Sequence, residues 1–302
     1  MHDALRLALR GLRGAVRENV PLAPLTHVRI GGPARYFVEP AVETDVQQVV
    51  RACRELDLPV FVLGGGSNLL VADAGVDGVV IDLGSLNRVV RDGMRLTAGA
   101  GVSLPSLLRG AREAGLAGLE ILTGIPAVVG GAVAMNAGTR DGETFDRVES
   151  LTVVDAAGEI QVLARGDCDP QYRDGRLDGR IVVHATFQLD EDDPKAIYAR
   201  FEDSLKRRNA TQPVTERSVG CVFQNPTGDS AGRLIERAGC KHLRRGGVQV
   251  SGKHANYFVN DHQGTCADFL ALVDDVRERV RAEFGVELEL EVRRWGLDAA
   301  GA

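Results

Sequence analysis

Patterns that identify metal-binding and exported proteins are missing from this chain of 302 residues. Its five cysteines are odd in number and widely spaced, with no Cys-x-x-Cys pair and no histidines in zinc-ligand spacing. Arginines interrupt the leucines of the first 20 residues, so the apolar core of a secretory signal is missing there. We therefore expect a cytoplasmic protein without a metal site. Residues 1–20 are expected to form a short surface helix rather than a transit peptide.

The chain also lacks an excess of positive charge and long apolar runs. A formal net charge of −6 argues against nucleic acid or an anionic membrane as a partner. It does not exclude a local basic pocket that binds an anionic substrate. The longest uncharged stretch, residues 121–139, is broken by Pro126 and by glycines, so it cannot span a bilayer. The 44% hydrophobic and 26% charged residues are typical of a soluble globular protein, and the length predicts two or three domains.

A glycine-rich loop is the most distinctive feature that is present. An apolar run at residues 60–63 is followed by Gly64-Gly65-Gly66-Ser67-Asn68 and by a second apolar run at residues 69–71. This order predicts a strand, a tight loop, and then a strand or a helix start. Consecutive glycines let main-chain N–H groups approach an anion. The loop fits neither Gly-x-Gly-x-x-Gly nor the Walker pattern, so from this stretch alone we favour a structural turn over a phosphate cradle.

Periodicity places this loop in a small α/β unit. Residues 44–56 carry apolar side chains at the i, i+3, i+4, i+7 spacing of one helix face, and a strand is predicted just before them. Short strands are predicted at 89–91 and 94–98 with Asp92-Gly93 as the hairpin turn, followed by a helix from Ser103. Strand, helix and strand in this order are typical of an α/β fold.

Residues 115–138 form a second stretch that is rich in small residues. Glycine and alanine bury little area, and glycine costs backbone entropy, so their number is unfavourable for an ordinary core. They suit main chain that approaches a large flat ligand, and equally main chain that packs closely against other main chain. The sequence leaves both open. Two glycine-rich stretches separated by strands suggest one extended ligand, such as a dinucleotide, that both contact.

An acidic connector at residues 190–194 indicates a domain boundary. Beyond it a long helix is predicted over residues 269–284, and an alternating strand is predicted over residues 286–293. The strand would place three glutamates on one side. From spacing alone, these carboxylates indicate a solvated face rather than catalysis.

Ordered motifs along most of the chain resemble one family, the UDP-N-acetylenolpyruvoylglucosamine reductases of bacterial peptidoglycan synthesis. The similarity extends from about Pro21 to Gly296, and without a tyrosine-bearing insertion it points to the shorter subgroup. The motifs are Leu63-Gly64-Gly65-Gly66-Ser67-Asn68-Leu69-Leu70, Gly118-Leu119-Glu120, Gly130-Gly131-Ala132-Val133-Ala134-Met135-Asn136-Ala137-Gly138, Tyr172-Arg173, Val222-Phe223-x-Asn225-Pro226, Ala231-Gly232-x-Leu234-Ile235-Glu236, Lys253-His254-Ala255-Asn256 and Glu291-Val292-Arg293.

The resemblance implies the fold, the cofactors and the reaction. It implies an α+β protein with a vanillyl-alcohol-oxidase-type FAD-binding domain of two α/β lobes over residues 21–192. A smaller α+β substrate domain would cover residues 193–302. FAD would be bound tightly and non-covalently, with NADPH as co-substrate. The reaction would reduce UDP-N-acetylglucosamine enolpyruvate to UDP-N-acetylmuramate, so the expected partner is a UDP-sugar. The sequence does not determine the oligomeric state, for which we expect a monomer.

The resemblance also implies the site residues. Arg173 would offer bidentate donors to the substrate carboxylate, Glu291 would polarise that group or hold its proton, and Cys221 would protonate carbon. The positions that match cofactor-binding residues are Gly64, Gly65, Gly66, Ser67, Asn68, Leu69, Thr123, Gly124, Ala132, Met135, Asn136 and Gly138. Those that match substrate-binding residues are Asn225, Lys253, His254, Asn256 and Arg293.

Cys221 is the main departure from the family pattern, because many members have Ser at this position. A thiol with a pKa of about 8.5 is mostly protonated at neutral pH and releases its proton more easily than a hydroxyl, so we predict a working enzyme. The alternative is a buried cysteine that serves only as a small hydrophobic residue. Smaller departures are Gly175 and Leu177, where a Ser and an aromatic residue are usual, and Ala127, where Gly is usual.

Two other function classes stay open. A flavin oxidase or dehydrogenase of the same superfamily would share the first two thirds of the chain, but not the segments 221–226 and 291–293. A nucleotide-sugar binding protein without redox chemistry would be colourless and would not respond to NADPH.

Overall fold

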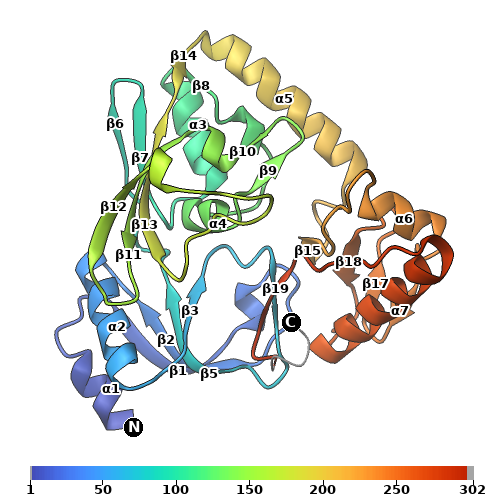
Figure 1. Ribbon diagram of the computed structural model, residues 1–302. Helices are drawn as coiled ribbons and strands as arrows, with labels where there is room; N and C mark the ends of the chain where they lie inside the picture. The colour runs from blue at the N-terminus through green and yellow to red at the C-terminus, as the bar shows by residue number, and fades with distance from the viewer. Residues whose placement is uncertain (1, 298–302) are drawn as a thin grey trace. The chain divides into compact units, whose positions relative to one another are not determined.

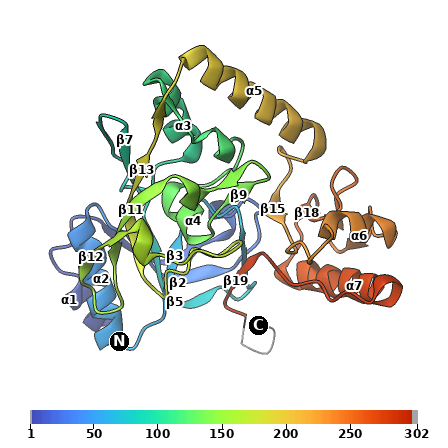
Figure 2. The same cartoon turned by 45° about the horizontal axis from the view of Figure 1, so that its top comes forward.

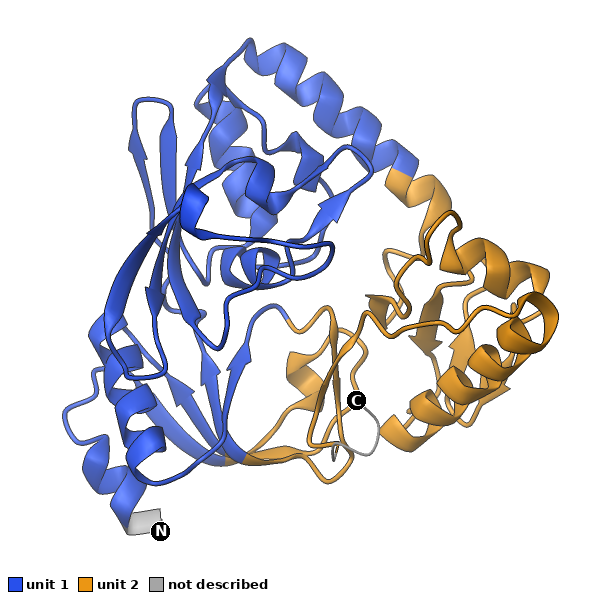
Figure 3. Cartoon of the chain, viewed as in Figure 1, with its two compact units in different colours: residues 1–18, 36–65, 78–207 blue, residues 19–35, 66–77, 208–302 orange. Residues whose placement is uncertain are grey.

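The computed structural model describes residues 2–297, and the chain divides into two compact units (Figure 1, Figure 3). Unit 1 comprises residues 1–18, 36–65 and 78–207, and unit 2 comprises residues 19–35, 66–77 and 208–302. Both units therefore combine segments that are distant in sequence. The change from unit 1 to unit 2 after Gly65 falls inside the glycine-rich loop. The consecutive domains expected at 21–192 and 193–302 stay a prediction.

The N-terminal part of the chain forms a helical layer on a four-stranded sheet. The sheet has the order β1-β2-β5-β3, and β3 runs parallel to β5 with Val60 opposite Val79. Apolar side chains of α1, α2 and these strands form one core cluster, which includes Leu5, Val49 and Ile81. The elements are α1 (His2–Ala8), β1 (Ala15–Pro21), η1 (Ala23–Leu25), β2 (Pro33–Glu39), α2 (Glu43–Glu55), β3 (Val60–Leu63), β4 (Leu69–Val71) and β5 (Val76–Asp82).

The helix expected over residues 1–20 is wrong beyond Ala8. Residues 15–21 form strand β1 instead. Glycine explains the change, since Gly11 has a φ of +88°, which ends a helix readily. Gly14 passes so close to the Glu39 carbonyl that an added Cβ would overlap it. The predicted helix over 44–56 is confirmed as α2.

The second part of unit 1 is an antiparallel sheet covered by short helices (Figure 2). Its order is β12-β11-β13-β7-β6, and the predicted hairpin at Asp92-Gly93 is confirmed, with Gly93 at a φ of +57°. The helix predicted from Ser103 is confirmed as α3, because the Ser103 hydroxyl accepts a hydrogen bond from Ser106 N and caps the helix. Leu107, Val133 and Phe187 belong to the core cluster beneath these helices.

The elements of this part follow in chain order: β6 (Val89–Asp92), β7 (Arg95–Gly99), α3 (Leu104–Glu113), β8 (Leu116–Ala117), η2 (Glu120–Leu122), α4 (Val129–Ala134), β9 (Gly138–Thr139), β10 (Gly142–Glu143), η3 (Thr144–Asp146), β11 (Val148–Val154), β12 (Ile160–Ala164), η4 (Arg165–Asp167), β13 (Ile181–Gln188), β14 (Asp190–Glu191) and α5 (Pro194–Thr211). The last residues of α5, 208–211, are assigned to unit 2.

Unit 2 holds an antiparallel sheet of order β15-β18-β17-β16 with α6 and α7. Its core includes Phe223, Phe258 and Phe269, and the Phe258 ring contacts the rings of the other two. The long helix predicted over 269–284 is confirmed as α7, which begins after the capping residue Thr265. The elements are β15 (Ser218–Cys221), α6 (Ala231–Arg237), β16 (Arg244–Arg245), β17 (Val248–Val250), β18 (Tyr257–Asn260), α7 (Cys266–Phe284) and β19 (Arg293–Trp295).

The alternating strand predicted over residues 286–293 is wrong for most of its length. Leu290 makes one isolated bridge to Phe223, and strand β19 begins only at Arg293, where it runs parallel to β4. Alternation alone cannot give a strand a partner, and here the chain moves from one partner to another within three residues. Within residues 2–297, no helix has the length and apolar character needed to cross a membrane.

Candidate functional site

The glycine-rich loop makes a sharp turn between β3 and β4, as the sequence predicts. Gly66 has a φ of +64°, and a Cβ at this position would overlap the carbonyl oxygen of Leu25. The Gly66 carbonyl accepts a hydrogen bond from His27 N at 2.9 Å. Glycine is therefore required at residue 66 by the fold of the loop itself, with or without a ligand.

Two glycines of this loop lie against the second small-residue stretch. A Cβ added at Gly64 would lie 3.4 Å from Val128 Cγ2 and 3.5 Å from Gly131 Cα, and one at Gly65 would lie 3.4 Å from the Pro126 carbonyl oxygen. The two stretches that were predicted to contact one ligand thus contact each other. Close main-chain packing, which the sequence left open, accounts for part of their glycine content.

Thr123 is the residue of this region that most directly indicates a ligand. Its side chain is 2% exposed, and its hydroxyl oxygen has no hydrogen-bond partner among the described residues. Buried polar atoms in proteins are almost always hydrogen-bonded, so an unpartnered one requires an explanation. A bound molecule with polar ring atoms would provide the missing partner. The following residue, Gly124, has a φ of +78° and adds no side chain that could obstruct such a molecule. These residues fit a flavin.

Asn136, which is predicted to bind the cofactor, is 2% exposed, and its side chain forms hydrogen bonds with three other residues. Its Nδ2 donates to Glu143 Oε2 at 2.6 Å and to the Gln171 carbonyl at 3.2 Å, while its Oδ1 accepts from Phe145 N at 3.2 Å. The side chain therefore fixes three neighbouring segments. Ala132 is buried in α4, Met135 follows the last residue of that helix, and Gly138 begins β9.

Arg173 lies in a turn that Asn136 helps to hold. The turn is closed by two hydrogen bonds between the main chains of Gln171 and Asp174, of 2.7 and 3.1 Å. Arg173 has a φ of +59°, a conformation that costs a residue with a Cβ about 1–2 kcal/mol. Its guanidinium lies 3.9 Å from the Glu143 carboxylate, which also accepts from Asn136. Glu143 thus links a predicted cofactor residue to a predicted catalytic residue.

Cys221, the predicted proton donor, lies opposite Tyr257 in the sheet of unit 2. Cys221 ends β15, Tyr257 begins β18, and the two residues are paired in the antiparallel register. Directly paired residues point to the same face of a sheet. Tyr257 is 6% exposed and its hydroxyl donates to Gln212 Oε1 at 2.9 Å. Burial raises the pKa of Tyr257, and interactions with Cys221, including a hydrogen bond between the side chains, raise it further.

Glu291 is held next to the same strand. Its N–H donates to the Val222 carbonyl at 2.8 Å, so its main chain lies beside the residue that follows Cys221. The Glu291 carbonyl accepts from Asn68 Nδ2 at 3.2 Å, and Arg293 N donates to the Asn68 carbonyl at 3.0 Å. The negative charge of Glu291 also contributes to the raised pKa of Tyr257. Cys221, Glu291 and Tyr257 are therefore neighbours within unit 2.

Several residues predicted to bind substrate form hydrogen bonds or ring contacts with other residues of the protein. Asn225 Oδ1 accepts from Ala231 N at 3.0 Å, and Lys253 Nζ donates to the Asn209 carbonyl. The His254 ring packs on the edge of Tyr257 with ring centres 4.9 Å apart, and burial lowers its pKa. The structure gives these side chains positions in unit 2, and their contact with a substrate stays a prediction.

Of the predicted catalytic residues, Cys221 and Glu291 belong to unit 2, and Arg173 belongs to unit 1. Tyr257 was not identified from the sequence, although it directly follows the motif at residues 253–256. Finding it requires the register of two strands that are about 36 residues apart, which no local pattern contains. Arg208 was also missed as a site candidate; its Nε is buried without a hydrogen-bond partner among the described residues.

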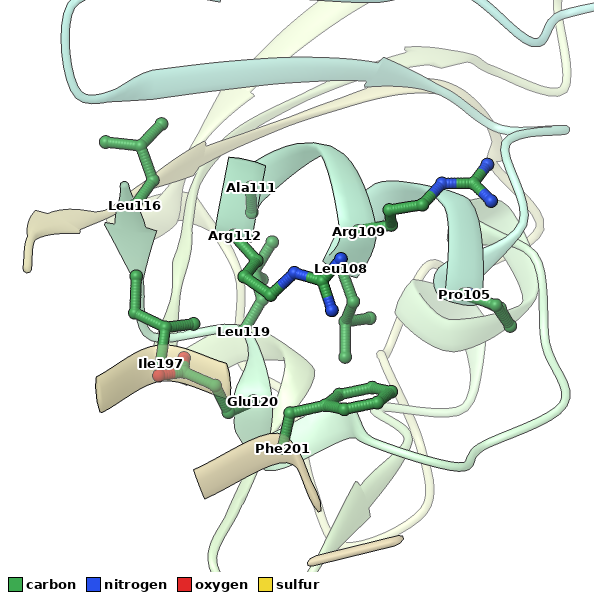
Figure 4. Close-up of a pocket in the computed structure, with 10 residues that line it drawn as sticks. All are labelled: Pro105, Leu108, Arg109, Ala111, Arg112, Leu116, Leu119, Glu120, Ile197 and Phe201. Carbon is green, nitrogen blue, oxygen red and sulfur yellow. The ribbon is translucent and has the colours of Figure 1, made fainter. Parts of the chain in front are cut away.

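Unit 1 also contains a cavity of about 190 Å³ between α3 and the beginning of α5 (Figure 4). Its walls are mostly apolar and include Leu108, Leu119 and Phe201, with Arg112 projecting over the apolar side chains. None of the residues predicted for the cofactor, the substrate or catalysis lines it. This cavity is therefore separate from the predicted site.

Comparisons with known proteins match the N-terminal and C-terminal parts of the chain to two known domain families. Residues 34–164 match the FAD binding domain family, and residues 212–295 match the C-terminal domain family of UDP-N-acetylenolpyruvoylglucosamine reductase. A UDP-N-acetylenolpyruvoylglucosamine reductase of Heliobacterium modesticaldum is 46% identical over 97% of this chain and 94% of its own length. A second such reductase, of Symbiobacterium thermophilum, is 44% identical over 98% of this chain and 97% of its own length.

A solved structure agrees with these sequence relatives. The crystal structure of UDP-N-acetylenolpyruvylglucosamine reductase from Thermus caldophilus has a TM-score of 0.80 and 38% identity, and covers 94% of this chain and 99% of that one. The predicted α+β fold, an FAD-binding domain followed by a C-terminal domain of this kind, is thereby confirmed. The chain belongs to the UDP-N-acetylenolpyruvoylglucosamine reductase family.

Proposed function

We propose that this chain reduces UDP-N-acetylglucosamine enolpyruvate to UDP-N-acetylmuramate, with Arg173, Cys221 and Glu291 as its catalytic residues. As a member of its family the chain is a flavoprotein oxidoreductase of peptidoglycan precursor synthesis that acts on a UDP-sugar. We further propose that it works as a cytoplasmic monomer and takes its reducing equivalents from NADPH.

The residues that would hold FAD come from both glycine-rich stretches. Gly64 to Leu69 would leave main-chain N–H groups for the pyrophosphate, since glycine removes the side chains that would obstruct it. Thr123, Gly124 and the segment 132–138 would surround the ring system, and the unpartnered Thr123 hydroxyl would bond to one of its polar atoms. The bound cofactor would supply, from NADPH, the hydride for the terminal carbon of the enolpyruvyl group.

Arg173 and Glu291 would act on the substrate carboxylate. Hydride addition to the terminal carbon places negative charge on the carboxylate as an enediolate, which fixed donors stabilise most effectively when they are already in position. The turn that carries Arg173 is fixed by Asn136 and Glu143, so its guanidinium needs little reorganisation to meet a carboxylate. Glu291 would polarise the same group or hold its proton.

Cys221 would complete the reaction by giving a proton to the carbon next to the carboxylate. The S–H bond breaks, a C–H bond forms, and the thiolate remains on the protein. The observation that carries this assignment is the placement of Cys221 beside Glu291, through the hydrogen bond from Glu291 N to the carbonyl of Val222. A proton donor and a carboxylate on adjacent segments suit a reaction that creates an enediolate and then protonates it.

The test is a spectroscopic separation of the two half-reactions under anaerobic conditions. The purified protein should be yellow, lose its visible flavin absorbance with NADPH, and regain it when UDP-N-acetylglucosamine enolpyruvate is added. A yellow protein that bleaches but never recovers its colour with this substrate would overturn the substrate assignment. A colourless preparation that binds the nucleotide sugar would instead support a binding protein.

A further inference from the structure

Tyr257 lies opposite Cys221 in the sheet of unit 2, and its hydroxyl interacts with the Cys221 side chain. The two residues are paired across β15 and β18, which places their side chains on the same face of the sheet. The Tyr257 hydroxyl also donates to Gln212 Oε1 at 2.9 Å. Tyr257 is 6% exposed and its ring packs against the His254 ring, so the hydroxyl oxygen is held in place while its O–H bond can still rotate.

One hydroxyl proton therefore has two acceptors within reach. A tyrosine hydroxyl has a single donor hydrogen, and an amide oxygen and a cysteine sulfur can both accept it. A neutral thiol is a weak acceptor, so the hydrogen bond to Gln212 is favoured before the reaction. After Cys221 has given up its proton, the thiolate is a charged and much stronger acceptor. The hydroxyl can then turn to the sulfur without moving the ring.

We propose that Tyr257 is a positioning residue that acts through Cys221, orienting the thiol before proton transfer and stabilising the thiolate afterwards, with Gln212 as the competing acceptor. The inference rests on the proposed function for the role of Cys221 as proton donor. No covalent step is added: the proton that leaves Cys221 goes to the substrate carbon, and Tyr257 keeps its own proton while changing the partner to which it donates.

The charged groups around Tyr257 are consistent with a hydroxyl that stays protonated. Arg208 and Glu291 act on it in opposite directions, the arginine lowering and the glutamate raising its pKa, while burial raises it most. Tyr257 therefore remains a neutral donor at the pH values at which cysteine thiols ionise. A tyrosine that ionised in that range could not stabilise a neighbouring thiolate.

The substitution Tyr257→Phe tests this contact without any substrate. Alkylation of Cys221 by iodoacetamide, followed by peptide mass mapping of the FAD-loaded protein over a range of pH, reports how easily the thiol ionises. Loss of the hydroxyl should move the midpoint of the alkylation profile to higher pH and slow alkylation at pH 7.5 roughly tenfold, because the thiolate loses a hydrogen bond that stabilises its charge. Tyr198→Phe removes a solvent-exposed hydroxyl, which bonds Glu202, and should change nothing.

A second variant is expected to act in the opposite direction. Gln212→Met removes the competing acceptor, so the Tyr257 hydroxyl becomes fully available to the thiolate and alkylation of Cys221 should become faster. Cys168, which is partly exposed, gives an internal reference in the same mass spectra. A tyrosine that only fills space would give no shift in either variant, and unchanged profiles in both would overturn the inference.

Turnover then separates this inference from the proposed function. In Tyr257→Phe, kcat should fall about tenfold with an unchanged KM and unchanged bleaching by NADPH, and the loss should be smaller when Cys221→Ser is already present. A shifted alkylation profile with normal kcat would overturn the role of Tyr257 in proton transfer while leaving the proposed function intact. A parent protein that never recovers its colour with the enolpyruvyl substrate would overturn the proposed function itself, and with it the catalytic role of Tyr257.

Discussion

The Asn256 side chain forms hydrogen bonds with both main-chain polar groups of Phe223. The Oδ1 of Asn256 accepts from Phe223 N at 2.9 Å, and its Nδ2 donates to the Phe223 carbonyl at 2.8 Å. The two residues are buried, at 2% and 0% exposure. This pair fixes the segment directly after Cys221, so a residue predicted to contact the substrate has a clear structural role.

Asn256→Leu should therefore lower the free energy of unfolding by about 2–4 kcal/mol, because it leaves two buried main-chain groups without partners. Urea unfolding of the parent and the variant measures the difference. The exposed Asn87 provides a control, since Asn87→Leu should stay within about 0.5 kcal/mol. Unchanged stability together with weakened substrate binding would show that Asn256 serves the substrate instead.

Cys221→Ala should reduce steady-state turnover by roughly 10²–10⁴-fold, which is the usual contribution of a general acid. Reduction of the flavin by NADPH, followed by stopped-flow absorbance, should be nearly unchanged. Cys221→Ser should retain substantial activity, because many family members have serine there. Equal losses in the two half-reactions of Cys221→Ala would contradict a role in proton transfer and favour a packing role.

Arg173→Ala should lower kcat by about 10²–10³-fold if the guanidinium stabilises charge on the substrate carboxylate. Glu143→Gln keeps the shape of the side chain that links Asn136 to Arg173 but removes its charge, and a smaller loss is expected. Arg140→Ala, at an exposed position, is the control for a general loss of positive charge. If Arg140→Ala and Arg173→Ala had the same effect on kcat, a specific role of Arg173 would be refuted.

Gly66→Ala should destabilise the protein more than Gly93→Ala, although both glycines have a positive φ. The strain of this conformation costs about 1–2 kcal/mol for a residue with a Cβ. At Gly93 an added Cβ has no neighbour within 4 Å, whereas at Gly66 it would overlap the Leu25 carbonyl. The thermal midpoints of the two variants and the FAD content of the purified proteins measure the difference. Equal thermal midpoints would show that the loop accommodates the added methyl group at residue 66 without any extra loss of stability.

Alkaline pH should destabilise the protein through its buried thiols. Burial raises the pKa of Cys266 to about 11 and that of Cys53 to about 12, above the value of 9.0 for an exposed thiol. A raised pKa of an acid means that folding favours its neutral form, so this contribution is present below pH 9 and is lost as pH rises toward 11–12. Urea unfolding at several pH values should show a shallower decline for Cys53→Ala than for the parent. An identical decline would show that Cys53 does not contribute.

Much of the local structure was predictable from the sequence. The helix at α2, the hairpin at Asp92-Gly93 and the glycine turn between β3 and β4 depend on side-chain periodicity or on a glycine at a positive φ. Both are properties of a few adjacent residues. The family motifs named the site candidates for the same reason, since each motif is a short continuous segment.

Local sequence thus predicted most of the elements, the family and the residue types of the site, whereas the partners of these elements depended on how the whole chain folds. The strand expected at 286–293 was interrupted because its segments pair with Phe223 and with β4. The Asn68 side chain bonds the Glu291 carbonyl across 223 positions, and Tyr257 meets Cys221 through a strand register. Such pairings depend on which surfaces the folded chain buries together, and that information is spread over the whole sequence rather than contained in any one segment.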